Sequence, residues 1–427
     1  MRQYNITPVL WLLGLLLIPW GIRAQGSEWQ KNTKPDYLRS IGVDPVLLEQ
    51  FGKWNVEDNW GGTSMVPRSF LLAINETIVG EWYADEYGNP LPETEAMAEK
   101  VRLASGGKTY ALVLLGILLD KHAELGLPED FGPDSRLYDL RWLPEGFPLS
   151  DPLKSGITID QVLRHTSGLM PESAGNDRGG QRSSIAFNLG GDVHPPLARS
   201  LYFEPGNPAS YIPNSPYSSV GFNHLSLIFT NLTGKKADSL LEELVLTPMG
   251  IREVAYSTSM EDREANWLID GVKWFSSGGL WLKPRDHARL GMTIAMNGKW
   301  NNRQIVSQNW INRLTRTGDY PDLLVNAPGF WTGQKIKGAG YRPLRPDIPE
   351  DLIVFGEPGV CVTYCIPSMG LSAVRTGRIV GVDWEQQENE FLQRLIGLFA
   401  ENSPVGLENG VSAQRHGSDC SMAQQVY

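Results

Sequence analysis

Both ends of the chain carry short β-prone runs, whereas the middle is rich in loops and short helical patterns. Near the start, residues 69–88 (SFLLAINETIVGEWYADEYG) predict two strands around a turn at Asn75-Glu76. Near the end, the stretches 351–359, 360–368 and 371–377 are divided by Gly and Pro and predict an antiparallel meander. Strands from both ends of a chain can share one sheet around whatever lies between them. The sequence therefore predicts an α/β (α+β) fold, in which an antiparallel sheet is flanked by helices and a mostly helical lobe is inserted at approximately 130–270.

Helical periodicity supports this layout. A long apolar run follows Ser105, and two further helices are expected within 222–251, separated at Gly234. Another begins at Pro284, after a glycine-rich turn. The stretch 384–401 predicts an amphipathic helix with four apolar side chains on one face: Phe391, Leu395, Ile396 and Phe399.

The N-terminal 24 residues have the pattern of a secretory signal peptide. One or two positive charges precede an apolar run that is too short to span a bilayer comfortably, and the segment ends at Ala24. We therefore expect a periplasmic or secreted protein without a stable membrane anchor. The expected folded domain covers 25–402, and the Ser-, Gly- and Gln-rich segment 403–427 predicts a flexible tail.

Charge and cysteine content narrow the class of protein further. The formal net charge of -10 argues against a nucleic-acid binder. The three cysteines, Cys361, Cys365 and Cys420, lack the spacing of a disulfide framework, and the first two are interpreted as buried apolar side chains. No metal-ligand spacing is present, so neither a metal nor an organic cofactor is expected. No pattern indicates an oligomeric state.

The run GGKT at 106–109 resembles the end of a phosphate-binding loop. That motif requires a glycine at the position that Arg102 occupies, and no buried strand precedes the run. The same stretch places Ser105 three residues before Lys108. Residues i and i+3 lie on one face of a helix, so the amine would sit beside the hydroxyl. Burial would favour the neutral amine, which could accept the hydroxyl proton. By spacing alone, an N-cap serine followed by a surface lysine remains an alternative.

Two downstream stretches favour the serine interpretation. ITIDQVLRHTSGL (157–169) and PYSSVGFNHLSLIFTNLTGK (216–235) follow in order. With the Ser105 run, the first strand pair, the segment 276–300 and the ending LSAVRTG, they resemble the serine β-lactamase-like hydrolase family over roughly 40–400. That family includes class C β-lactamases, DD-peptidases, esterases and amidases. The resemblance implies a β-lactamase/transpeptidase-like fold with the active site between the sheet and the helical lobe.

The resemblance also assigns roles to individual residues. Ser105 matches the acyl-accepting serine and Lys108 its partner. Tyr217 matches the tyrosine of a Tyr-x-Asn element that relays protons, with Ser219 in place of the asparagine; Tyr211 is the alternative. By the same match, the oxyanion hole would be formed by the N–H groups of Ser105 and Val360.

The third family element, Lys-Thr-Gly or His-x-Gly, corresponds to Glu357-Pro358-Gly359. Glu357 reverses the expected charge and would repel carboxylate-bearing substrates such as penicillins by about 1 kcal/mol or more. Neutral or cationic esters and amides fit better. A Ser-His-Asp triad using His165 is disfavoured because the chain contains no G-x-S-x-G elbow.

The sequence therefore predicts an exported serine hydrolase that acts through an acyl-enzyme on a small-molecule or peptide ester or amide. An efficient β-lactamase is not expected. The alternative is a non-catalytic binding or sensor protein that retains the penicillin-binding fold. The departures at Ser219 and Glu357 favour this alternative, and the intact Ser105/Lys108 pair opposes it.

The glycines Gly106 and Gly107 leave one structural question open. Each costs about 1 kcal/mol relative to alanine within a helix. Either the first turn is irregular, or another part of the chain approaches the backbone closely beside Ser105.

Overall fold

The computed structural model describes residues 29–57, 62–64, 66–93, 99–169, 218–256, 279–315, 331–332, 349, 351–357, 359–377, 379–381 and 384–399. A six-stranded sheet in the order β3-β2-β12-β11-β10-β9 forms the centre of the structure, and its neighbouring strands are all antiparallel. Its strands are β2 (Arg68–Ile74), β3 (Thr77–Ala84), β9 (Trp331–Thr332), β10 (Ile353–Glu357), β11 (Cys361–Ile366) and β12 (Leu371–Thr376).

The two ends of the chain meet in the middle of this sheet. β2 pairs along its length with β12, in a register that joins Ile74 to Leu371 and Ser69 to Thr376. β2 and β3 are joined at Asn75 and Glu76, which both have positive φ, as expected for a tight two-residue hairpin turn. The predicted closure of one sheet by strands from both ends of the chain is confirmed.

Alternate residues of each strand face two separate hydrophobic cores. In β2, Phe70, Leu72 and Ile74 pack into one core, and Leu71 and Ala73 pack into the other. This alternation follows from the two-residue period of a strand. Because both faces of the sheet are covered, β2 is apolar at successive positions and buried throughout.

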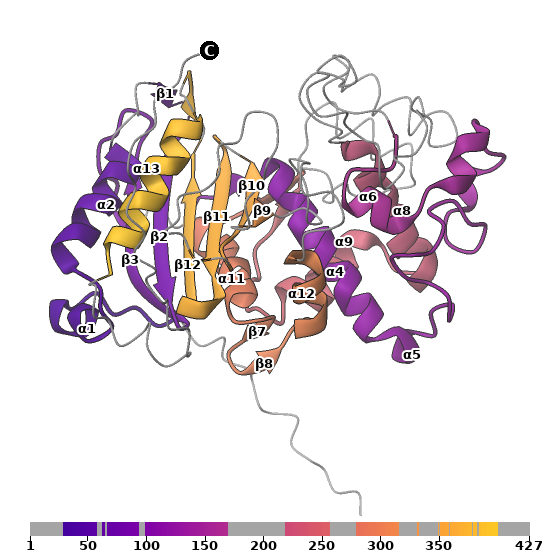
Figure 1. Cartoon of the computed structure of the whole chain (residues 1–427), viewed down its shortest axis with the longest axis horizontal. Helices are drawn as coiled ribbons and strands as arrows, with labels where there is room; N and C mark the ends of the chain where they lie inside the picture. Colours follow the sequence, from indigo (N-terminus) through magenta and orange to yellow (C-terminus); the bar gives the residue numbers. More distant parts are fainter. Residues whose placement is uncertain are drawn as a thin grey trace, which may run out of the picture.

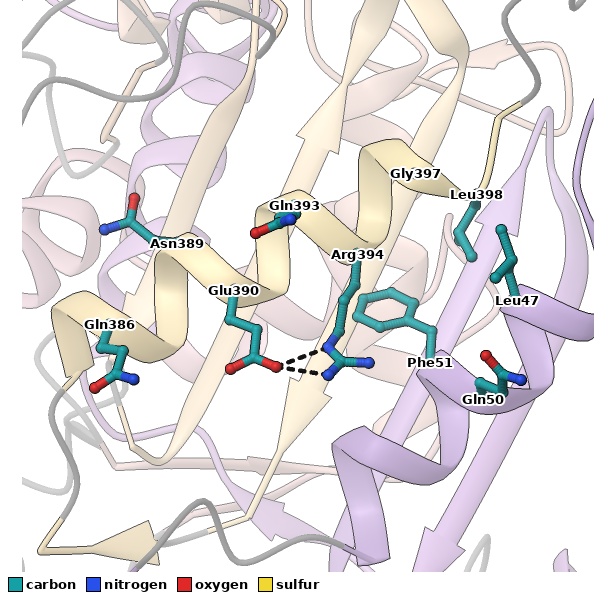
Figure 2. A pocket seen from close by; sticks show the side chains of 10 residues that line it. All are labelled: Leu47, Gln50, Phe51, Gln386, Asn389, Glu390, Gln393, Arg394, Gly397 and Leu398. Carbon is teal, nitrogen blue, oxygen red and sulfur yellow. Dashed lines mark hydrogen bonds and ion pairs between the residues drawn. The ribbon is translucent and has the colours of Figure 1, made fainter.

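Helices cover both faces of the sheet (Figure 1). On one face lie α2 (Pro45–Glu57) and α13 (Trp384–Gly397), with α1 (Pro35–Ser40) nearby. A hollow of about 600 Å³ lies between α2 and α13 and is lined mostly by polar side chains. Figure 2 shows the side chains that line it, with Phe51 on α2 among them. On the other face, α11 (Pro284–Ala295) packs on β11 and β12, and α4 (Gly107–Asp120) contacts β10.

Beyond α4 lies α8 (Ser219–Thr233), which packs against α4 (Figure 1). The other helices are α5 (His122–Leu125), α6 (Ile159–Leu163), α9 (Ala237–Leu241), the π-helix Glu242–Leu246 and α12 (Gln308–Thr315). Short 3₁₀ turns cover Pro144–Gly146, Pro152–Gly156 and Pro367–Met369. Two-residue strand pairs join β1 (Thr63–Ser64) to β13 (Ile379–Val380) and β7 (Lys299–Trp300) to β8 (Arg303–Gln304).

Several finer predictions agree with this arrangement. The helices expected after Ser105, on either side of Gly234, from Pro284 and from residue 384 are present. Cys361 and Cys365 are buried free thiols, and burial raises the pKa of both. The signal segment 1–24, the tail 403–427 and Cys420 lie outside the described residues, as do parts of the expected lobe, so the domain bounds stay a prediction.

Close packing of α11 on the sheet depends on the absence of a side chain at Gly291. A Cβ there would lie 2.4 Å from Ser372 Oγ and 2.7 Å from Thr363 Cγ2, both on β-strands. We expect Gly291→Ala to lower the free energy of unfolding by about 1–3 kcal/mol, because the extra carbon overpacks this interface. The matched control is Gly397→Ala on α13, where a Cβ meets nothing within 4 Å. Urea denaturation should show the control unchanged or slightly stabilised; equal effects at the two glycines would contradict the packing argument.

Candidate active site

Ser105 lies on a tight turn that joins a small sheet to α4. The small sheet has three strands in the order β4 (Val101–Arg102), β6 (Leu280–Leu282) and β5 (Ala255–Tyr256). β4 pairs with β6, the middle strand. The Leu103 N–H donates to the Leu280 carbonyl at 2.9 Å, and a 3₁₀ turn over Ala104–Gly106 then leads into α4. Ala104 has a φ of 46°, which is costly for a residue with a Cβ. Ser105 is therefore held at a strained corner between two regular elements.

The Lys108 amine lies beside the Ser105 hydroxyl. Lys108 Nζ is 3.2 Å from Ser105 Oγ, one helical turn away, as the spacing predicts. Lys108 is only 3% exposed, and its Nζ lies 5.8 Å from the centre of the Phe222 ring on α8. Ser105 itself is half-buried. Because Lys108 is buried beside the Ser105 hydroxyl, the alternative of a surface lysine is wrong.

The first explanation offered for the paired glycines holds, because the first turn is 3₁₀ rather than α. A Cβ on Gly106 would lie 3.9 Å from the Gly356 Cα on β10, which is ordinary van der Waals contact, so no close approach requires a glycine at this position. Gly356 itself has a φ of 111°, and a Cβ on it would collide with the Cys361 carbonyl oxygen within the turn to β11. The end of β10 packs against the turn that carries Ser105.

This packing brings Glu357, the last residue of β10, to the backbone of Ser105. The Ser105 N–H donates to Glu357 Oε2 at 3.0 Å, across 252 residues of sequence. Glu357 is half-buried. A hydrogen bond with an ionised acceptor is stronger than one between neutral groups. In this structure, the amide expected to serve as the first oxyanion donor is bonded to a carboxylate of the same chain.

Gly359 and Val360, the other residues expected at the substrate, form the turn between β10 and β11. The Val360 N–H, expected to be the second oxyanion donor, donates in this structure to the Glu357 carbonyl at 3.0 Å. Two longer-range bonds fix the turn: the Gly377 N–H donates to the Val360 carbonyl, and the Ile379 N–H to the Gly359 carbonyl. These bonds hold the turn that follows Glu357, and Glu357 itself pairs with Cys361 on β11.

The element expected to supply the proton relay lies partly outside the described residues, which include neither Tyr217 nor Tyr211. Ser219 is the first residue of α8, and its side chain is not described. Ser218 caps this helix, and its N–H donates to His165 Nδ1 at 3.0 Å.

His165 supports the site as a neutral side chain. It is fully buried, and its ring stacks on Phe222 with the centres 5.1 Å apart. Burial, with a smaller contribution from the charge of Lys108, lowers the pKa of His165 to about 3. A neutral ring can accept the Ser218 N–H, which agrees with the expected structural role.

The sequence did not predict three of these contacts. The charge of Glu357 was read as repelling substrate, without its bond to the Ser105 amide. The RHTSGL run offered a local signal for His165, but its bond to Ser218 spans 53 residues. The ring of Phe222 lies near both Lys108 and His165. The sequence pattern indicates only that Phe222 is an apolar residue of a helix.

Comparison with known proteins identifies related sequences and folds. The profile of the family described as Beta-lactamase matches residues 75–340, more than half of the chain. The esterase EstB of Burkholderia gladioli is 31% identical over 196 residues, which are 44% of this chain and 45% of the esterase. The match thus spans less than half of that relative's length.

Two solved structures share the fold at low sequence identity. A putative beta-lactamase from Bacteroides dorei superposes with a TM-score of 0.56 at 17% identity, covering 83% of this chain and 99% of that one. A penicillin-binding protein homolog from Caulobacter crescentus superposes with a TM-score of 0.55 at 15% identity, covering 83% and 97%. The predicted resemblance and fold class are confirmed.

The lowered pKa values of two buried histidines predict how the free energy of unfolding depends on pH. Burial lowers the pKa of His165 and of His287 to about 3, whereas an unfolded histidine titrates near 6.5. Between these values the unfolded chain binds protons that the folded chain does not, so the free energy of unfolding falls as pH falls from about 6.5 towards 3. Replacing His165 with Gln should reduce this slope by up to about 1.4 kcal/mol per pH unit.

Urea unfolding of wild type and His165→Gln at several pH values between about 7 and 5 measures this slope. The variant also loses its imidazole bond to Ser218, so a uniform loss of stability is expected at every pH, and only the slope is diagnostic. A wild-type stability that is flat below about pH 6.5 would contradict the neutral state of both histidines.

Proposed function

Since the chain belongs to the beta-lactamase family, we propose that it is an exported serine hydrolase that cleaves an ester or amide through an acyl-enzyme at Ser105. The observation that carries this proposal is the 3.2 Å separation between Lys108 Nζ and Ser105 Oγ, with Lys108 buried and Ser105 half-buried. The 31% identity to an esterase over part of the chain agrees with this class of reaction.

In the proposed reaction, Ser105 Oγ attacks the carbonyl carbon and its proton passes to Lys108 Nζ, which acts as a neutral amine. The tetrahedral intermediate collapses, the bond to the leaving group breaks, and Tyr217 protonates the leaving oxygen or nitrogen. Water then attacks the acyl carbon, gives up a proton through the same groups, and releases the acid and free Ser105. Every proton stays within the set of Ser105, Lys108, Tyr217 and water.

The choice of Tyr217 over Tyr211 rests on the sequence that follows Tyr217, because Val-Gly-Phe and the helix after it match the family element. Counted forward from Pro205-Gly206, Tyr211 would fit instead. Next to Tyr217 in sequence, Ser218 donates its N–H to His165, whose ring stacks on Phe222 near Lys108.

Three substitutions test this chemistry. Ser105→Ala should abolish hydrolysis of p-nitrophenyl esters and covalent labelling by a fluorophosphonate probe, because no nucleophile remains. Lys108→Met and Tyr217→Phe should each lower kcat by about 10²–10⁴, the range for losing a general acid–base group. Tyr211→Phe is the matched control and should remain within a few-fold of wild type. A fluorescent penicillin should label poorly, because Glu357 opposes its carboxylate.

The same experiments distinguish the proposed hydrolase from the alternative, a non-catalytic binding or sensor protein. Wild-type protein that is neither labelled by the fluorophosphonate nor able to hydrolyse the esters would support that alternative and sink the hydrolase proposal. Full activity of Ser105→Ala would contradict the assignment of the nucleophile.

Export of the protein is proposed from the sequence pattern of residues 1–24 alone. Within the described part of the chain, no helix combines the length and hydropathy needed to cross a bilayer. When the full chain is produced in a Gram-negative host, the periplasmic or culture fraction should contain a protein whose N-terminal residue is Gln25. Protein that retains Met1 and stays with the cells would contradict cleavage.

A further inference from the structure

The Ser105 amide can serve only one acceptor well at a time. A backbone amide carries one hydrogen, and here it points at Glu357 Oε2, 3.0 Å away. Acyl transfer at Ser105 needs the same donor for the oxygen of the substrate carbonyl, which becomes negatively charged in the transition state. The carboxylate of Glu357 and the substrate oxygen therefore compete for one N–H group.

The competition favours the carboxylate in the free protein. An ionised acceptor makes a stronger hydrogen bond than the neutral carbonyl oxygen of an ester. Glu357 is also already in place, since its backbone is fixed by the turn to β11 and by its pairing with Cys361. A neutral substrate must displace this bond before its own carbonyl can be polarised. It carries no charge that would stabilise the displaced carboxylate.

A substrate with a positive charge next to its acyl carbon displaces the Glu357 carboxylate at a lower cost in free energy. A half-buried carboxylate that rotates away from the amide is stabilised by an ammonium group within a few ångströms. A negatively charged substrate would have the opposite effect. The neutral state of His165 matters here as well, because a charged imidazole close to Lys108 would repel the same ammonium.

We propose that Glu357 caps the Ser105 amide in the free enzyme and that acyl groups carrying an ammonium beside the carbonyl carbon remove this cap most readily. Glu357 is then a specificity-determining residue, and the preferred substrates are esters or amides of amino acids or similar amines. This inference rests on the proposed function of Ser105 as the nucleophile.

A pair of nearly isosteric esters tests the proposal. Phenyl glycinate and phenyl propanoate differ by an ammonium in place of a methyl group, and assays near pH 6.5 keep the amine of phenyl glycinate largely protonated. In wild type, kcat/KM should be higher for the glycinate. In Glu357→Ala, the ratio of the two kcat/KM values should fall at least about tenfold, mainly because the propanoate reacts faster once the amide is free.

Two further variants make the result specific. Glu357→Gln keeps the size of the side chain and an acceptor oxygen but removes the charge, so its ratio should lie between those of wild type and Glu357→Ala. Glu129→Ala removes an exposed carboxylate after α5 that makes no described contact with Ser105 or Glu357, and it should leave both rates unchanged. Urea midpoints verify that each variant is folded.

The outcomes distinguish this inference from the proposed function. Wild type and Glu357→Ala with the same ratio, or a Glu357→Ala variant that is slower on both esters, would overturn the cap while Ser105-dependent labelling by the fluorophosphonate persists. Absence of labelling and turnover in wild type and both Glu357 variants would overturn the nucleophile assignment itself. Fluorophosphonate labelling that is slow in wild type and faster in Glu357→Ala supports both the Glu357 cap and the assignment of Ser105 as the nucleophile.

Discussion

Helix α4 has almost no solvent-facing side, and the rest of the structure is arranged around that fact. Its residues from Gly107 to Leu118 are all buried, with the sheet against one side and α8 and α9 against another. An apolar helix of this kind is stable only when its whole circumference is covered. The covering elements also enclose Lys108 near the first turn, so the packing that stabilises the helix removes water from the lysine amine.

The same enclosure explains why the buried histidines near the site form hydrogen bonds with specific partners. A buried polar atom without a partner costs roughly 1–3 kcal/mol, so each histidine close to α4 is tied into specific bonds. His287 lies between the Tyr110 hydroxyl and Thr363 Oγ1, at 3.0 Å from each, and His165 accepts the Ser218 N–H. His287 thereby links α4, α11 and the sheet, and His165 is joined to the start of α8.

Periodicity along the sequence was sufficient to predict the main strands and the long helices. β2, β3 and the β10–β12 meander are buried, alternating or β-branched runs bounded by turn residues, and α4 has a strong apolar pattern. The three-stranded sheet of β4, β5 and β6 was missed because two or three residues carry no measurable period. The strained φ of Ala104 and the bond from Ser105 to Glu357 depend on tertiary contacts, the second across 252 residues, and no local pattern predicts either.

The pairing of β2 with β12 also sets the order in which the chain can fold. The central strand pair joins Ile74 to Leu371, so the sheet cannot be completed until almost the whole chain has been synthesised. Until then, the hairpin of β2 and β3 exposes an apolar edge with unpaired backbone groups, which can associate with other chains. Contacts between residues so far apart in sequence also slow folding, because a long loop must close before they form. A chain truncated before Leu371 should therefore aggregate rather than form a smaller version of the fold.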